Sequence, residues 1–530
     1  MDAVNLTGEE MLDWAEPSAD RPGSSAVLNQ AVRDVITPGE RVLLAGYADE
    51  GLIRSLTSAG THVDLLLRGL TDAESAKTAY ADLAVTVHSG SLNMFPESGY
   101  DVVLALGGTA RLNTPEHVLS WPDAVAALRR TVRPGGTVAV VVANPFGVDR
   151  IADPRSGVRT TDDDWPAGTA ARTVTGLADA LRTLELTDVR TFALFPGVEV
   201  PTAIVERAAM SETFAGVITS AWSSSPQHPA VTDLRRLVRE AIRAGLGVEL
   251  APAWLFVGHT GPAGASGAAP ARAYADRPVA PELAVVQAYR ADGSTGWHRE
   301  PLGDRSPKTS GKVMRSPEKL AGPVNAGPLL EDILLDACGQ HDLTTVRTLL
   351  SRYAKWVTDA GATLDNVVVT GDELELLDPS WELSGETTAE VLTTRACLRL
   401  ARRLQSGAYE HPWPAGVTVE RLTISLVATA GLTVSPDDVR TAAELDAEIA
   451  DAMGVPVEES TAPLGHREAL ATVSRLTVAL EEAQAQAKGL DELVAKRDRQ
   501  MADLRRSITF RIGRVVTGPL SALKKARRRR

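Results

Sequence analysis

The residues best suited to hold a small molecule lie in the stretch RVLLAGYADEG at positions 41–51. An apolar run leads into Gly46, and a helical pattern containing a second glycine, Gly51, follows. This order is typical of a nucleotide-binding strand–loop–helix unit, in which backbone N–H groups and a helix N-terminus face the ligand. Such loops usually hold three closely spaced glycines, but Ala48 and Glu50 stand where further glycines are expected. The stretch therefore predicts a cofactor loop that side chains partly fill.

A second pair of residues could bind a metal ion. Asn366 and Asp378 are twelve residues apart and enclose two β-like runs joined by a Gly-Asp turn. The hairpin is similar to that of kinase-like folds, where the Asn and the Asp bind magnesium ions that bridge nucleotide phosphates. Such folds place an aspartate five residues before the Asn, where this chain has Gly361. The pattern favours vestigial metal positions, or side chains that cap a turn, over an active kinase.

No catalytic residue can be identified from the sequence. His88 and His117 lie near predicted loops, but a lone histidine is more often a surface or capping residue. Cys338 and Cys397 are the only cysteines. Two thiols without ligand spacing exclude a thiolate zinc site of the usual kind and fit a reduced, cytosolic protein.

The elements that must position the loop follow a regular alternation from about residue 30 to 205. The expected strands are buried apolar runs, and the expected helices have amphipathic patterns between them. This alternation predicts an α/β fold with a parallel sheet that helices cover on both faces. The expected strands are 41–46, 62–69, 83–90, 100–108 and 137–145, and the expected helices are 73–83 and 121–132.

Several motifs in this order carry a family resemblance. The loop at 41–51, YDVVLALGG at 100–108 and RPGGTVAVVV at 133–142 resemble the signature of class I S-adenosylmethionine-dependent methyltransferases. With VVANPFGVDRI, FALFPGVEVPTAIV and AGLGVELAPAWLFVGH, the chain is similar to methyltransferase–kinase fusions of bacterial surface-polysaccharide synthesis, such as O-antigen chain terminators. The resemblance implies a Rossmann-like methyltransferase domain over residues 1–262 and S-adenosylmethionine as its cofactor.

The resemblance also implies cofactor-binding positions, and several hold unexpected residues. They are Gly46, Tyr47, Gly51, Arg68 and Ser91. Arg68 stands where the family has an acid that accepts hydrogen bonds from the ribose, and an arginine offers donors only. Two hypotheses follow. The cofactor binds through the glycines and backbone contacts with the ribose held differently, or the fold is retained and cofactor binding is lost.

The rest of the chain predicts three further parts. Residues 263–277 are rich in Ala, Gly and Pro and are expected to be a linker. Residues 278–456 are expected to form a degenerate α+β kinase-like domain, for which Mg²⁺ and ATP are not expected cofactors. Apolar positions spaced alternately three and four apart predict a coiled coil at 466–506, hence a homo-oligomer. A single amphipathic helix lying on the body is the alternative.

The C-terminal tail, residues 507–530, mixes apolar residues with bases. From Leu504 to Arg530 there are ten bases and no acid, in a chain of 530 residues with net charge −13. This pattern predicts binding to an anionic membrane surface, with nucleic-acid binding or a solvated terminus as alternatives. The acidic body argues against nucleic acid. No signal peptide or spanning segment is expected, so the predicted location is cytoplasmic, peripheral to the inner membrane face.

Two functional hypotheses follow. The first is a methyltransferase that acts on a surface glycan or its lipid-linked precursor. The second is a catalytically inactive scaffold, in which both enzyme folds serve as docking surfaces and the coiled coil sets valency.

Overall fold

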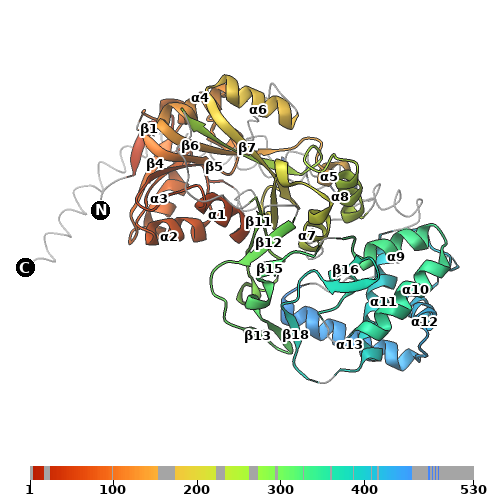
Figure 1. The fold of residues 1–530 in the computed structure, drawn as a ribbon. Coiled ribbons are helices and arrows are strands. Elements are labelled where there is room, and N and C mark those ends of the chain that lie inside the picture. Colours follow the sequence, from red (N-terminus) through yellow and green to blue (C-terminus); the bar gives the residue numbers. More distant parts are fainter. Residues whose placement is uncertain are drawn as a thin grey trace, which may run out of the picture. The chain divides into compact units, whose positions relative to one another are not determined.

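The structure is a computed structural model, and Figure 1 shows it as a ribbon. The chain divides into two compact units, Met1–Ser460 and Thr461–Arg530. The described residues are 4–12, 14–16, 24–97, 99–152, 173–222, 233–261, 272–277, 279–292, 296–325, 327–357, 361–385, 387–407, 409–414 and 417–455, with helical positions at 476–477, 480, 484 and 487–488.

A large mixed sheet organises the first half of the first unit. Its central seven strands have the order β4-β3-β2-β5-β6-β9-β7, and every neighbouring pair is parallel except the two that involve β9. The predicted α/β fold with a mostly parallel sheet is thus confirmed. The strands are β2 (Arg41–Ala45), β3 (His62–Leu67), β4 (Val85–Gly90), β5 (Tyr100–Ala105), β6 (Val132–Ala143), β7 (Leu186–Phe195) and β9 (Ala253–Thr260).

Alternating side chains explain why helices cover both faces of this sheet. Leu43 and Val103 belong to one buried core, whereas their neighbours Leu44 and Leu104 belong to another. Successive residues of a strand point to opposite faces, so each face needs its own apolar cover. One face is covered by α4 (Trp121–Thr131) and α6 (Val174–Thr183), and the other by α1 (Ala26–Arg33), α2 (Glu50–Ser58) and α3 (Leu70–Ala79).

The sheet continues beyond the boundary that the sequence suggested. Strand β10 (Ala273–Ala275) is buried and pairs antiparallel with β8 (Ala203–Glu206) and β11 (Gln287–Asp292). The prediction of a linker over 263–277 is therefore corrected at residues 273–275. Ala273 and Ala275 are small, as in a linker, but Tyr274 between them is a large buried side chain of the core on the α1–α3 face. Strands β12 (Gly296–Pro301) and β15 (Gly322–Pro323) follow, and β1 (Asn5–Gly8) pairs parallel with β4 at the opposite edge, giving thirteen strands.

The remaining part of the first unit is mainly helical around a third core. Two small sheets accompany the helices, and one of them is the predicted hairpin of β16 (Val367–Thr370) and β17 (Glu373–Leu376). The kinase-like assignment stays a prediction. The other sheet holds β13 (Lys308–Ser310), β14 (Val313–Arg315) and β18 (Trp381–Leu383). The helices of this part are α9 (Leu330–Gly339), α10 (Leu343–Trp356), α11 (Ala389–Ser406), α12 (Val419–Thr429) and α13 (Pro436–Met453). Helices α5 (Val148–Ala152), α7 (Glu212–Trp222) and α8 (Leu234–Arg243) instead contribute to the same core as α4 and α6.

The predicted coiled coil and tail lie almost wholly outside the described residues. Three of the apolar seam positions, Leu476, Leu480 and Ala487, are described as helical and exposed in the single chain. Within the described ranges, none of the helices has both the length and the apolar character needed to cross a membrane.

Candidate functional site: the carboxyl edge of the sheet

The fold brings three of the predicted site residues to one edge of the sheet. Gly46 follows β2, Arg68 follows β3 and Ser91 follows β4, and these three strands are parallel neighbours. Strands β3 and β4 lie on one side of β2, whereas β5 and β6 lie on the other. Ligands of open α/β sheets bind outside the carboxyl ends of the strands at such a reversal.

The loop after β2 has the backbone expected of a cofactor turn. Gly46 adopts φ +89°, a conformation that favours glycine, and α2 begins four residues later. A Cβ placed on Gly46 would lie 3.3 Å from Cδ2 of Leu112, so that side chain occupies the space directly over the glycine. Tyr47 packs against the core on the α1–α3 face, and Gly51 is exposed in the first turn of α2.

Arg68 lies at the end of β3 and is only 5% exposed. Its Nε and Nη2 each lie 2.5 Å from Oε1 of Glu16, whose side chain is also buried. Its Nη1 donates to the carbonyl oxygen of Asn113 at 3.1 Å. The guanidinium of Arg68 is thus directed at groups of the same chain.

The residues before Ser24 explain this arrangement. We call residues 4–16 the N-terminal strap, of which the structure describes all but residue 13. After β1, the strap crosses the end of β3, where Met11 forms a bridge with Gly69. Ser91, 1% exposed, accepts a hydrogen bond from the backbone N–H of Asn93 and donates its own N–H to Gly8.

These contacts allow a direct test of whether the edge fits S-adenosylmethionine. The N-terminus of α2 offers the kind of backbone N–H groups that such a ligand needs, whereas the N–H of Gly46 is bonded to the carbonyl oxygen of Leu66. The end of β3 does not fit a ribose as it stands, because Arg68 supplies no acceptor and Glu16 covers it. The described conformation therefore provides a helix N-terminus at the first loop, where Leu112 lies over Gly46, and excludes a ribose at the second.

One titratable group at this edge was missed by the sequence analysis. Asp149 lies in α5, in the loop cluster after β6, and its Oδ1 is buried without a hydrogen-bond partner. Burial raises the pKa of Asp149 to about 6, against the smaller effects of the Arg150 charge and two backbone hydrogen bonds. A carboxyl with such a pKa can exchange a proton near neutral pH. Nothing in its sequence neighbourhood signals this burial.

The two histidines have partners elsewhere. The Nε2 of His88 lies 3.1 Å from Oδ1 of Asp64, a buried residue in the middle of β3. Burial alone would raise the pKa of Asp64, but hydrogen bonds from His88 and Tyr100 hold it below its usual value. His117 pairs with Glu9 of the strap at 2.7 Å. Both histidines thus have structural partners, as expected for lone histidines.

Asn366 and Asp378 also come together, but as a hydrogen-bonded pair. The Nδ2 of Asn366 donates to the carbonyl oxygens of Gly361 and Asp378, and its Oδ1 accepts from the N–H of Asp378. The Asp378 carboxylate accepts from Ser380 and from the indole of Trp381. Burial would raise the pKa of Asp378, but Arg315 and Arg299 hold it below its usual value. Both side chains are engaged within the hairpin, which supports the turn-capping interpretation.

No three His, Cys, Asp or Glu side chains in the part of the chain that the structure describes are grouped so that they could hold a metal ion.

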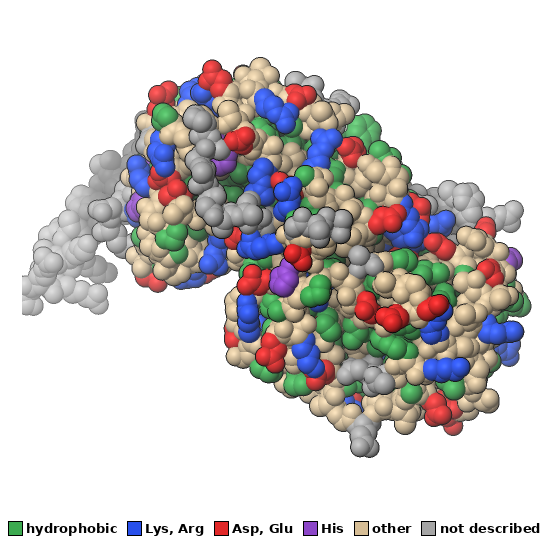
Figure 2. All heavy atoms as spheres, viewed as in Figure 1, with side chains coloured by type: hydrophobic (Ala, Val, Ile, Leu, Met, Phe, Trp, Pro, Cys, Tyr) green, Lys and Arg blue, Asp and Glu red, His purple; other side chains and the backbone are tan. Residues whose placement is uncertain are grey.

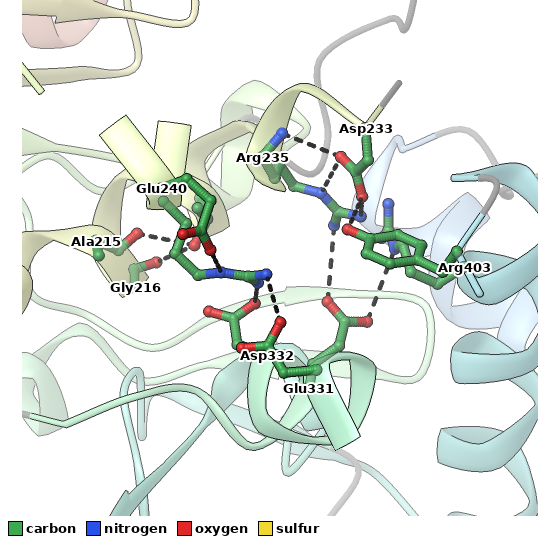
Figure 3. Close-up of polar contacts among 12 residues, drawn as sticks. Ala215, Gly216, Asp233, Arg235, Glu240, Glu331, Asp332 and Arg403 are labelled. Atoms are coloured by element: carbon green, nitrogen blue, oxygen red, sulfur yellow. Dashed lines mark hydrogen bonds and ion pairs between the residues drawn. The ribbon is translucent and has the colours of Figure 1, made fainter. Parts of the chain in front are cut away.

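A second polar site is a small charged hollow between α7, α8 and α9. Figure 3 shows that Asp233 and Arg235 from α8 and its N-cap face Glu331 from α9, and that Arg403 of α11 approaches Glu331 from the other side. Arg235 lies 2.9 Å from Asp233 and 3.9 Å from Glu331, and Arg403 lies 3.7 Å from Glu331. Arginines and acids alternate here, so the charges balance within the chain.

Arg239, one turn further along α8, extends the same network. It pairs with Asp332, and its Nη2 lies 3.3 Å from Oδ1 of Asp336. Burial raises the pKa of Asp332, and the charges of Arg239 and Arg235 offset part of this effect. Because each buried charge has an opposite charge beside it, the hollow is best explained as an ion-pair network that joins α8 to α9.

Charges of both signs are also mixed on the surface. Acidic and basic side chains are interspersed over the face that Figure 2 shows. Exposed basic side chains form ion pairs with neighbouring acids, such as Arg54 with Glu50 and Lys312 with Glu448.

No family model matches the chain, and no curated protein matches it. Solved structures that are similar to it include S-adenosylmethionine-dependent methyltransferases at low sequence identity. One from Thermotoga maritima has 12% identity and a TM-score of 0.27, and covers 44% of this chain and 87% of its own. One from Archaeoglobus fulgidus has 12% identity and a TM-score of 0.27, with coverages of 44% and 90%.

A phosphoethanolamine N-methyltransferase from Haemonchus contortus, solved with phosphomonomethylethanolamine and S-adenosylhomocysteine, has 14% identity and a TM-score of 0.28. It covers 46% of this chain and 54% of its own. Similarity at this level assigns no substrate, and the strand order remains the basis of the fold description.

Proposed function

We propose that this protein is a methyltransferase-like protein of cell-surface glycan biosynthesis whose N-terminal domain binds S-adenosylmethionine. In this proposal it acts on a glycan or a lipid-linked glycan precursor at the inner face of the membrane. The observation that carries the proposal is the strand order β4-β3-β2-β5-β6-β9-β7, with a left-handed Gly46 at its reversal point. The motifs at 100–108 and 133–142 occupy β5 and β6 of this sheet, as the family resemblance requires.

Calorimetric titration of the full chain with S-adenosylmethionine tests the cofactor. We expect a dissociation constant below about 1 mM, since backbone contacts at the first loop remain when the ribose acceptor is lost. Gly51→Leu places a side chain at the exposed start of α2 and is expected to weaken binding about ten-fold. Gly339→Leu is the matched control, because Gly339 is also exposed at a helix end with negative φ. Equal affinities in the two variants would contradict binding at this loop.

A non-catalytic scaffold is the second candidate, and two observations favour it. Glu16 covers the position expected to hold the ribose, and the candidate metal ligands Asn366 and Asp378 are engaged with each other. The scaffold is favoured if calorimetry detects no heat of binding at millimolar S-adenosylmethionine in either of two proteins. These are the wild type and a variant whose N-terminal strap is detached, such as Glu16→Lys.

Membrane association through residues 507–530 is a separate part of the proposal. Ten bases near an anionic surface contribute about 1 kcal/mol each, and apolar residues between them can enter the headgroup region. We expect the protein to sediment with phosphatidylserine-containing vesicles at low salt and to be released as salt rises. A chain truncated at Leu504 should stay in the supernatant; if it still sediments, the tail is not the anchor.

Self-association through residues 466–506 is likewise proposed from the apolar seam. Sedimentation equilibrium of the full chain should give a mass above the 56.2 kDa monomer. A polar double substitution at Leu476 and Leu480 should return the protein to the monomer, since both are seam positions.

A further inference from the structure

We infer that the N-terminal strap is a gate over the carboxyl edge of the sheet, held shut by the ion pair between Glu16 and Arg68. Ligand binding at the carboxyl edge and docking of the strap are then mutually exclusive. The inference rests on the proposed function, because it concerns how the same edge is opened.

The strap covers the ends of two adjacent strands at the places where a nucleoside would lie. A Cβ on Gly69, after β3, would be 2.8 Å from the carbonyl oxygen of Trp14. A Cβ on Gly90, at the end of β4, would be 2.5 Å from the carbonyl oxygen of Gly8. Glycine at both positions lets the strap pass in direct contact with the strand ends, so no room for a ligand is left between them.

The strap is attached by a small set of contacts that can break together. The N–H of Met11 donates to the carbonyl oxygen of Arg68 at 2.9 Å, and the N–H of Leu70 donates to that of Met11 at 3.1 Å. The N–H of Glu16 donates to Oδ2 of Asp72 at 2.8 Å. The guanidinium of Arg68 lies 5.7 Å from the ring centroid of Trp14. The strap also pairs through β1 with β4, so its release separates this edge strand from the sheet as well.

Charge explains why the Glu16–Arg68 pair controls the gate. Arg68 cannot lose its proton, so a buried guanidinium needs an anion or water beside it. Glu16 supplies this anion from the strap, which can detach. Arg68 stays in place at the end of β3, a strand inside the sheet. When Glu16 is replaced by a cation, the two charges repel, and the strap departs so that water can reach Arg68.

Strap release also uncovers the polar groups that a nucleoside could use. The carbonyl oxygen of Arg68 and the carboxylate of Asp72 then lose their strap partners and become acceptors at the edge, and the N–H of Ser91 loses its bond to the carbonyl oxygen of Gly8. Asp72 lies in the first turn of α3, four residues after Arg68. An acceptor for ribose hydroxyls is thus available in the open state, although Arg68 occupies the position of the family's acid.

The test combines hydrogen–deuterium exchange with calorimetry on the full chain, using S-adenosylhomocysteine as the probe. The amides of Met11 and Leu70 report whether the strap is docked. We expect Glu16→Lys to raise their exchange without ligand and to bind the probe at least about ten-fold more tightly than the wild type. Saturating probe should raise the same exchange in the wild type. Glu300→Gln is the control, because it removes an acid from an exposed pair with Arg305.

The outcomes separate the gate from the proposed function. Equal affinity of wild type and Glu16→Lys, or probe binding that leaves the Met11 amide protected, overturns the gate and leaves cofactor binding standing. Absence of binding in both proteins, with Glu16→Lys as thermally stable as the control, overturns cofactor binding and the gate with it. The charge-neutral Glu16→Gln should fall between wild type and Glu16→Lys in both measurements, and a Gln variant that matches Lys contradicts the repulsion argument.

Discussion

Replacing Arg239 by alanine tests whether the charged network between α8 and α9 is structural. Arg239 is 2% exposed and pairs with Asp332, whose side chain is also buried. Removal of Arg239 leaves Asp332 as a buried carboxylate without its principal partner. Such a group either stays charged at high cost or takes up a proton.

The free energy needed to protonate Asp332 sets the upper limit of the stability that the Arg239→Ala variant loses. The carboxyl has an ordinary pKa of 3.8, so protonating it at pH 7 costs about 4 kcal/mol, and at pH 5 about 1.5 kcal/mol. The folded pKa of Asp332 lies above the unfolded value, so the variant loses stability as the pH rises. We therefore expect Arg239→Ala to lower the free energy of unfolding by about 3–4 kcal/mol at pH 7 and by about 1.5 kcal/mol at pH 5.

Urea denaturation at the two pH values measures this directly. The control is Arg243→Ala, since Arg243 is one third exposed and pairs with Glu240 at 3.3 Å and Asp336 at 3.4 Å. A partly exposed pair of this kind contributes within about 1 kcal/mol. If Arg239→Ala costs no more than the control, or costs the same at pH 5 as at pH 7, the buried-charge argument is refuted.

Two further predictions concern single groups. In thermal unfolding, Asp149→Asn should stabilise the protein by about 2–3 kcal/mol at pH 8 and have little effect near pH 4. The folded pKa of Asp149, about 6, exceeds the ordinary value of 3.8, so the wild-type protein loses stability as the pH rises through 6 and the carboxyl becomes charged. An equal effect at both pH values would contradict the assigned burial. Asn366→Ala should lower the free energy of unfolding by about 2–4 kcal/mol, because three hydrogen bonds are lost. The control Asn325→Ala loses one hydrogen bond, to Leu376 of the same hairpin, and should cost about 1 kcal/mol. Because the side chains of Asn366 and Asp378 are already engaged, Mg²⁺ should leave the wild-type Tm unchanged, and a Tm rise that Asn366→Ala abolishes would restore the metal hypothesis.

The candidate site could be predicted in part. Gly46, Arg68 and Ser91 follow apolar runs, and parallel strands bring their carboxyl ends to one edge, so their proximity follows from local pattern. The direction of Arg68 does not follow from local pattern. It depends on Glu16, which is 52 residues away and belongs to a segment without periodicity. The burial of Asp149 likewise depends on the chain near Pro252, which lies 2.8 Å from a Cβ placed on Gly147.

The sequence by itself determined the strands at the centre of the sheet and the hairpin at 367–376. Runs of apolar residues indicate strands buried on both faces, and alternation of polar and apolar residues indicates strands buried on one face. The tertiary structure alone decided that Ala273–Ala275 is a strand, since the neighbouring backbones of β8 and β11 supply its hydrogen bonds. It also decided which charges are paired, such as Arg239 with Asp332 across 93 residues. Charge pairing depends on distances between elements, and a linear sequence does not record those distances.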